Sequence, residues 1–146
     1  MKHKHLLLAG LVAVSAGFSS CSKEEILGTM TADIGGTQWT ATAQGAVSVQ
    51  NRFVITGSTT SSSIVLSPNG NAVGTYNTDV FSGNVQPFVY TPSLSSPQNT
   101  YVGSGGSIII QTVASNRLTG TFSITATNSQ GASQTISGSF KNILVN

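Results

Sequence analysis

The chain has 146 residues and a formal net charge of +2, and only 7% of its residues are charged, against about 25% in an ordinary globular domain. This composition excludes the basic patch with which proteins bind nucleic acid. The chain has a single cysteine, so an intramolecular disulfide is excluded as well. The abundant Ser, Thr, Asn and Gln predict a neutral surface that forms hydrogen bonds.

The first 20 residues have the three-part layout of a secretory signal peptide. Lys2 and Lys4 form a basic start, residues 6–14 form an apolar run, and small residues follow. This run is too short to span a bilayer, which takes about 20 apolar residues. We therefore expect residues 1–20 to be a removable leader, with a buried N-terminal helix as the alternative. Its removal leaves four basic and four acidic residues, a net charge of zero.

The lone cysteine directly follows this leader. The sequence Phe18-Ser19-Ser20-Cys21 resembles a bacterial lipobox, whose usual form is Leu-Ala-Gly-Cys, and it departs from that form at Phe18. The resemblance implies that Cys21 receives a diacylglyceryl thioether and becomes an acylated mature N-terminus. Two or three acyl chains anchor a protein stably, because each buried methylene contributes about 0.8 kcal/mol. The alternative is a free reactive thiol in an exported protein.

The residues after Cys21 bear on the destination of the protein. Ser22 differs from the Asp that retains enterobacterial lipoproteins in the inner membrane. Lys23, Glu24 and Glu25 resemble the short signal of one Lys and acidic residues that sends Bacteroidota lipoproteins to the outer face of the outer membrane. The resemblance implies a lipid-anchored protein of the outer membrane, exposed at the cell surface. The alternative is that these charges only solvate a tether.

Residues 21–28 are thus expected to form a lipidated tether, and residues 29–146 a single domain, since domains most often have about 100–150 residues. Alternation with a period of two predicts short strands through its first half. Gly35-Gly36 is expected to be a turn or a bulge, Gln50-Asn51 a hairpin turn, and Pro87 predicts an edge or bulged strand. The first strand is expected within 29–42 and to continue over 38–43. Further strands are expected at 46–50, 52–57, 64–66, 74–76 and 85–90, with a loop at 92–99.

The C-terminal third predicts a three-stranded antiparallel meander. Its strands are expected over 107–113, 117–127 and 134–143, joined by turns at 114–116 and 128–131. Residue Ile143 breaks the alternation of the last strand, which indicates a bulge or the end of the strand.

Short strands separated by turn signals predict an all-β fold, an antiparallel β-sandwich, with a closed lipocalin-like β-barrel as the alternative. A barrel that carries a ligand needs an internal apolar cavity of about 300 Å³ or more. We expect Phe122 and Phe140 in the core together with Leu118 and Ile124, and Trp39 in the core or at its edge.

Several stretches of the domain resemble one family. They are MTADIGGTQWTAT, RFVITGS, TYVGSGGSIIIQ, RLTGTFSITATNSQG and ISGSFKNI. This layout resembles an uncharacterised family of small all-β Bacteroidota lipoproteins, over roughly residues 29–145. The resemblance implies no activity and no catalytic residue that could be transferred to this chain.

The chain beyond the leader is poor in catalytic side chains. Both histidines lie in the leader, which removes Ser-His-Asp and Cys-His catalysis and the commonest metal ligand. Asp33 and Asp79 are the acids of the predicted domain. They could act as a glycosidase pair or contribute to a weak calcium site, although such residues more often bond backbone in turns. We predict no catalytic residue, no metal site and no cofactor.

Aromatic side chains are the remaining candidates for binding. Those that could stack on sugars are Trp39, Tyr76, Phe81, Phe88, Tyr90 and Tyr101. Phe88 and Tyr90 share one face of a Pro-containing strand beside the long loop, so we expect them to form an exposed binding surface. The sequence as a whole predicts a non-enzymatic surface lipoprotein, a binding or structural module with a glycan or protein partner. The alternative is a carrier of small apolar ligands.

Overall fold

The computed structural model describes residues 28–79 and 85–146, which form ten β-strands and one short 3-10 turn, η1. In these two ranges no helix is long and apolar enough to cross a bilayer. The elements are β1 (Thr29–Ile34), β2 (Thr37–Thr40), β3 (Ala43–Val49), β4 (Arg52–Ser58), β5 (Ser63–Leu66), β6 (Gly74–Asn77), β7 (Phe88–Thr91), η1 (Pro97–Asn99), β8 (Tyr101–Ala114), β9 (Arg117–Asn128) and β10 (Ser133–Leu144).

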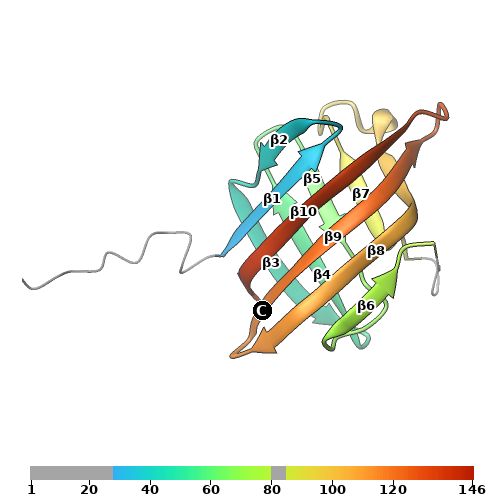
Figure 1. Ribbon diagram of the computed structural model, residues 1–146. Coiled ribbons are helices and arrows are strands. Elements are labelled where there is room, and N and C mark those ends of the chain that lie inside the picture. Colours follow the sequence, from blue (N-terminus) through green and yellow to red (C-terminus); the bar gives the residue numbers. More distant parts are fainter. Residues whose placement is uncertain (1–27, 80–84) are drawn as a thin grey trace, which may run out of the picture.

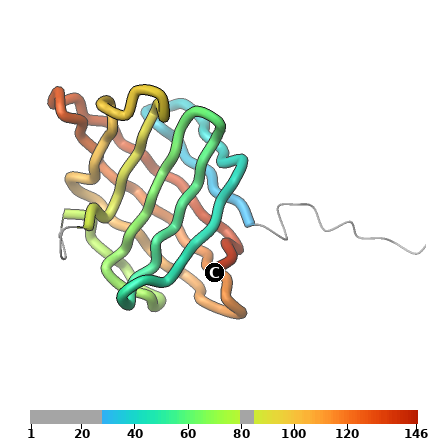
Figure 2. Tube along the Cα trace, turned by 180° about the vertical axis from the view of Figure 1, so that it is seen from behind, coloured from blue at the N-terminus to red at the C-terminus, as the bar shows by residue number. Residues whose placement is uncertain are grey.

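The strands form one sheet in the order β2-β1-β10-β9-β8-β7-β5-β4-β3, and β6 adds to β8. Neighbouring strands all run antiparallel. The sheet curls into a half-barrel, with β1, β10, β9 and β8 in one layer and β3, β4, β5 and β7 in the layer behind it (Figures 1 and 2). The all-β prediction is confirmed. The two layers face each other as in a sandwich, yet they belong to one continuous sheet, as in a barrel.

The chain crosses between the layers at residues 41–42. Ala41 N donates to Met30 O at 2.9 Å, whereas Thr42 N donates to Ser58 O at 2.8 Å. The expected strand over 38–43 is therefore split into the end of β2 and the start of β3, because the backbone changes its partner strand at this point. At the far edge of the sheet, Ala46 of β3 bridges Val145, which brings β3 next to the end of β10.

Hairpin turns are present at both predicted positions, and the turn expected over 114–116 has only two residues between its strands, because Ala114 belongs to β8. Gln50 and Asn51 have φ values of 51° and 63°, and Ser115 and Asn116 have φ values of 52° and 57°. Positive φ at both central residues gives the turn a twist that matches its strands. The predicted bulge is also present, because the register between β9 and β10 shifts between Phe140 and Ile143.

The expectation of an edge strand at Pro87 is wrong. Strand β7 begins at Phe88, directly after Pro87, and it lies between β5 and β8 inside the sheet. The proline is tolerated because it precedes the strand, where its missing N–H removes no ladder bond. Its carbonyl is used, since it accepts a hydrogen bond from Ser67 N at 2.8 Å.

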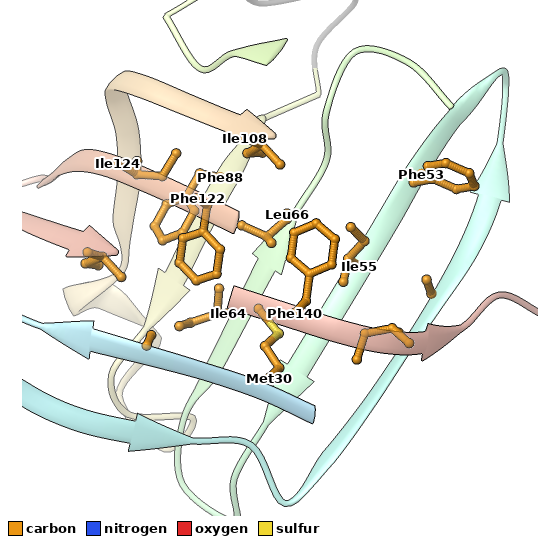
Figure 3. Close-up of a cluster of buried hydrophobic side chains, with 14 of the residues drawn as sticks. Met30, Phe53, Ile55, Ile64, Leu66, Phe88, Ile108, Phe122, Ile124 and Phe140 are labelled. Atoms are coloured by element: carbon orange, nitrogen blue, oxygen red, sulfur yellow. The ribbon is translucent and has the colours of Figure 1, made fainter. Parts of the chain in front are cut away.

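The inward faces of both layers supply one hydrophobic core. Figure 3 shows Met30, Phe122 and Phe140 of the front layer pointing toward side chains of β4 and β5 in the back layer. The predicted core positions Leu118, Phe122, Ile124 and Phe140 are 0–3% exposed. Trp39 is partly buried and packs against this core, as expected for a residue at its edge.

Two phenylalanines of the core lie over glycines of the neighbouring strand. Phe122 of β9 pairs with Gly138 of β10, and Phe140 of β10 pairs with Gly120 of β9. A Cβ atom added at Gly120 would collide with the Phe140 ring and with the backbone oxygen of Ile109. A Cβ atom at Gly138 would collide with the Phe122 ring and with backbone of β1. Each ring thus occupies the space that a side chain on the next strand would need.

This packing predicts that Gly120→Ala destabilises the protein, although alanine is less flexible than glycine. We expect the free energy of unfolding to fall by about 1–3 kcal/mol, the usual cost of overpacking a core. Gly45→Ala in β3 is the matched control, because an added Cβ has no atom within 4 Å there. Urea unfolding followed by Trp39 fluorescence measures both variants. Equal stability of the two would contradict this account of the core.

Candidate functional site

An open groove of about 540 Å³ lies at one end of the half-barrel. Three connections meet there: the β1–β2 turn, the β7–β8 segment and the β9–β10 turn, which lie at the top of Figure 1. The groove is lined by Ile34, Thr37, Gln38, Trp39, Tyr90, Pro92, Asn99, Tyr101, Asn128, Gln130, Ala132 and Gln134. This is the mouth of the curled sheet, a place where ligand sites often occur in barrels.

Three aromatic residues give the groove its apolar wall. Tyr90 of β7 and Tyr101 of β8 are register partners, and their ring centroids lie 6.1 Å apart with a tilt of 31°. Trp39 comes from β2, and its indole Nε1 donates to Ser62 Oγ at 2.9 Å. Because Ser62 Oγ also shares a hydrogen bond of 2.7 Å with Thr59 Oγ1, the indole is held in a fixed orientation.

The polar part of the lining consists mainly of side-chain amides. Asn128 Oδ1 accepts hydrogen bonds from Gln130 N at 3.1 Å and Ala132 N at 2.9 Å, which shapes the β9–β10 turn. The side-chain amides of Asn99, Gln130 and Gln134 form no hydrogen bond with any of the described residues. They are therefore available to a ligand as both donors and acceptors.

Among the residues that the structure describes, no charged one lines the groove. Asp33 lies nearby and serves the β1–β2 turn: Oδ1 accepts from Gly36 N at 2.8 Å, and Oδ2 accepts from Gln38 Nε2 at 3.1 Å. The carboxylate thereby positions one amide of the groove, Gln38. The predicted role of Asp33 as a turn residue is confirmed.

The structure does not bring the two aspartates of the domain together. Asp33 is on β1, whereas the exposed Asp79 follows β6, and β10, β9 and β8 lie between these strands. At about 4.8 Å per strand step, that separation is too wide for a catalytic pair. Within residues 28–79 and 85–146, no group of three or more His, Cys, Asp or Glu could hold a metal ion.

Burial raises the pKa of the Tyr90 phenol above its ordinary value of 10.0, and the neighbouring Tyr101 adds to the shift. The Tyr90 hydroxyl therefore stays protonated at physiological pH, and it remains a hydrogen-bond donor at the wall of the groove.

The predicted exposed pair of Phe88 and Tyr90 is corrected by the structure. The two residues do share a face, but this face points inward because β7 lies inside the sheet. Phe88 is fully buried and its ring lies 6.1 Å from that of Phe122, so the expectation of an exposed ring is wrong. Tyr90 is 8% exposed and lines the groove near its strand end.

Trp39 and Tyr101 are among the aromatics that the sequence suggests for stacking on sugars, but the sequence favours Phe88 and Tyr90 as the binding surface. Trp39 and Tyr101 both lie near strand ends, beside predicted turns or loops. That position is the one sequence feature that could have indicated a place at the open end of the sheet. Tyr76 lies elsewhere, with its hydroxyl donating to Ala72 O at 2.7 Å. The remaining sequence candidates lie outside the described residues: Cys21, Ser22, Lys23, Glu24, Glu25 and Phe81.

Comparisons with known proteins identify the family but no function. Searches of curated proteins and of solved structures give no significant match. A family model described as a domain of unknown function, DUF6252, matches residues 28–144. The match spans nearly the whole curled sheet, from the residue before β1 to the last residue of β10. The chain therefore belongs to the DUF6252 family, which agrees with the expected membership of an uncharacterised family.

Proposed function

We propose that this protein is a non-enzymatic binding module, anchored by lipid at the bacterial outer surface, whose groove binds a neutral saccharide. The observation that carries the proposal is the lining of the groove, which combines Trp39, Tyr90 and Tyr101 with several side-chain amides and, within the described part of the chain, no charged group. Saccharides present apolar C–H faces and hydroxyl groups side by side, so aromatic rings and amides together match their surface.

The size of the groove supports a small oligosaccharide. A volume of about 540 Å³ lies within the range of about 300–1,000 Å³ that is usual for small-molecule sites. The groove is open at its mouth, so a longer chain could continue out of it. Tyr90 and the amides would fix the orientation of the sugar, while the exposed parts of Trp39 and Tyr101 would cover its apolar face.

The carrier of apolar ligands is the second candidate, and the structure supports it less. The space between the layers is filled by large side chains such as Phe88, Phe140 and Met30, each fully buried. The groove at the mouth has amides in its wall, and a purely apolar ligand would leave them without hydrogen bonds. Unpaired buried polar groups are costly, so the site favours a ligand with hydroxyl groups.

The surface location rests on the sequence around the lone cysteine. Cys21 follows a secretory leader and a lipobox-like stretch, and Ser22, Lys23, Glu24 and Glu25 form the surface-export-like signal. Acylation at Cys21 would hold the sheet at the outer membrane by a short tether. A neutral sugar-binding groove is useful there, because polysaccharides are among the polymers that meet a bacterial surface.

The groove predicts a matched pair of amide variants. Gln130→Ala, at an exposed position in the lining, should weaken binding of the best neutral ligand on a glycan array roughly tenfold, or ~1.4 kcal/mol. Gln111→Ala, an exposed position on β8 away from the groove, should leave binding unchanged.

Tyr101→Ala should abolish array binding, and Tyr101→Phe should retain the stacking part of it. Failure of the unaltered protein to bind any glycan on the array would refute the saccharide proposal.

The anchor predicts that Cys21→Ser yields a protein without acyl chains, which stays uncleaved or becomes soluble. The reason is that only a thiol can form the thioether. Metabolic labelling with a palmitate analogue and fractionation of membranes measure the effect. Label that persists in the Cys21→Ser protein would show that the anchor lies elsewhere.

The export signal predicts a change of membrane face. Replacing Lys23, Glu24 and Glu25 by alanine should keep the protein lipidated but move it from the cell surface to the periplasmic face. Protease treatment of intact cells should digest the unaltered protein and spare the variant, with a periplasmic marker as the control for cell integrity. Equal digestion of both proteins would mean that these charges only solvate the tether.

A further inference from the structure

The end of the half-barrel opposite the groove carries a second distinctive surface, which we name the basal end. It consists of the β3–β4 turn, residues 67–73, the β8–β9 turn and the last residues of β10, and it lies at the bottom of Figure 1. Backbone hydrogen bonds join these segments. Phe53 N donates to Gly70 O at 3.1 Å, Val145 N to Asn116 O at 2.8 Å, and Asn146 N to Ala46 O at 2.9 Å.

Exposed apolar side chains gather at the basal end. Among the described residues, four of the seven large hydrophobics that are exposed lie there: Val49, Val73, Val113 and Leu144, at 48%, 60%, 41% and 36% exposure. They come from four separate segments of the chain, so local sequence does not explain their grouping. Single exposed hydrophobics are ordinary, but four of them at one end of the molecule point to an interaction surface.

The same end is positively charged. The described residues include three cationic side chains, and all three lie at or near it: Arg52, Arg117 and Lys141. Arg52 donates to Asn69 Oδ1 at 2.9 Å and Arg117 to the backbone oxygen of Asn142 at 2.8 Å, so both guanidinium groups are held in place. The two acids among the described residues lie elsewhere. Asp33 is at the groove end, and Asp79 follows the segment where Thr78 bonds Gly106, midway along β8.

The described part of the chain begins on the same side of the molecule. Thr29, the first residue of β1, pairs with Lys141, only three residues before Leu144 at the basal end. Those three residues span about 10 Å of strand. Cys21 precedes Gly28 by seven residues, which can reach about 25 Å when extended. The tether is therefore long enough for the basal end to lie against the surface that holds the acyl chains.

We propose that the basal end is a membrane-contact face, which rests on anionic phosphate headgroups and directs the groove away from the bilayer. Arg52, Arg117 and Lys141 would lie at the level of the phosphates, and the exposed valines would enter the apolar boundary beneath them. This inference rests on the proposed lipidation of Cys21. A second copy of the chain fits the same face poorly, because pairing two basal ends would bring like charges together.

The test uses the lipidated protein reconstituted in vesicles, with one labelled cysteine in each variant. Because lipid occupies the Cys21 thiol, Val73→Cys provides a unique thiol at the basal end, and Leu94→Cys provides a matched one at 49% exposure near the groove. Each is labelled with an environment-sensitive fluorophore and quenched by brominated lipids. Phosphatidylglycerol-containing vesicles are compared with vesicles of pure phosphatidylcholine, and intact mass confirms the acyl chains.

We expect the label at position 73 to shift to the blue and to be quenched in the anionic vesicles, while the label at 94 is unaffected. Lys141→Gln in the Val73→Cys protein should lower the equilibrium constant for contact about fivefold, the effect of one cation at an anionic surface. Rising salt should lower it further, since screening shortens the reach of the charges.

Three outcomes overturn the inference. An acylated protein whose label at 73 is no more quenched than that at 94 has no preferred orientation, although its anchor stands. A blue shift at 73 that depends on protein concentration without vesicles shows that the basal end binds a second copy instead. A protein that carries no acyl mass disproves the anchor itself, and the inference falls with it.

Discussion

The reciprocal packing of two phenylalanines over two glycines is the contact on which the rest of the structure depends. Phe122 and Phe140 project into the core from β9 and β10, and each covers the glycine that the other strand places opposite it. Large rings on adjacent strands would otherwise compete for one space. The glycines let both rings lie close to the sheet, where they fill the interior between two layers of a single curled sheet.

The curl of the sheet creates two unlike ends. At the end that carries the β1–β2 and β9–β10 turns, the sheet has a neutral groove lined by aromatic rings and amides. At the bottom, two tight hairpin turns, residues 67–73 and the end of β10 carry exposed hydrophobic residues and cations. A flat sheet of the same strands would separate β2 from β7 and would have no groove, because Trp39 reaches Ser62 only across the curl. The two functions that we propose, saccharide binding at one end and membrane contact at the other, thus both depend on the curl of the sheet.

Local signals predicted most of the fold. The turns at Gln50-Asn51 and Ser115-Asn116, the C-terminal meander and the irregularity at Ile143 follow from residue type and period, which act between near neighbours. The prediction for Pro87 failed because the sequence does not show which strands come to lie on either side of β7. Its neighbours β5 and β8 are brought there by pairings between residues far apart in the chain. The burial of Phe88 depends on those pairings.

By itself, the sequence determined the all-β class, the hairpin turns and the core phenylalanines, because composition and local periodicity carry that information. It also holds everything that points to Cys21 as an anchor. Only the tertiary structure decided that Phe88 is buried and that Tyr90 joins Trp39 and Tyr101 in one groove. It alone gathered the exposed valines and the cations at the other end. Both surfaces unite residues far apart in the chain, and only long-range strand pairing brings such residues together.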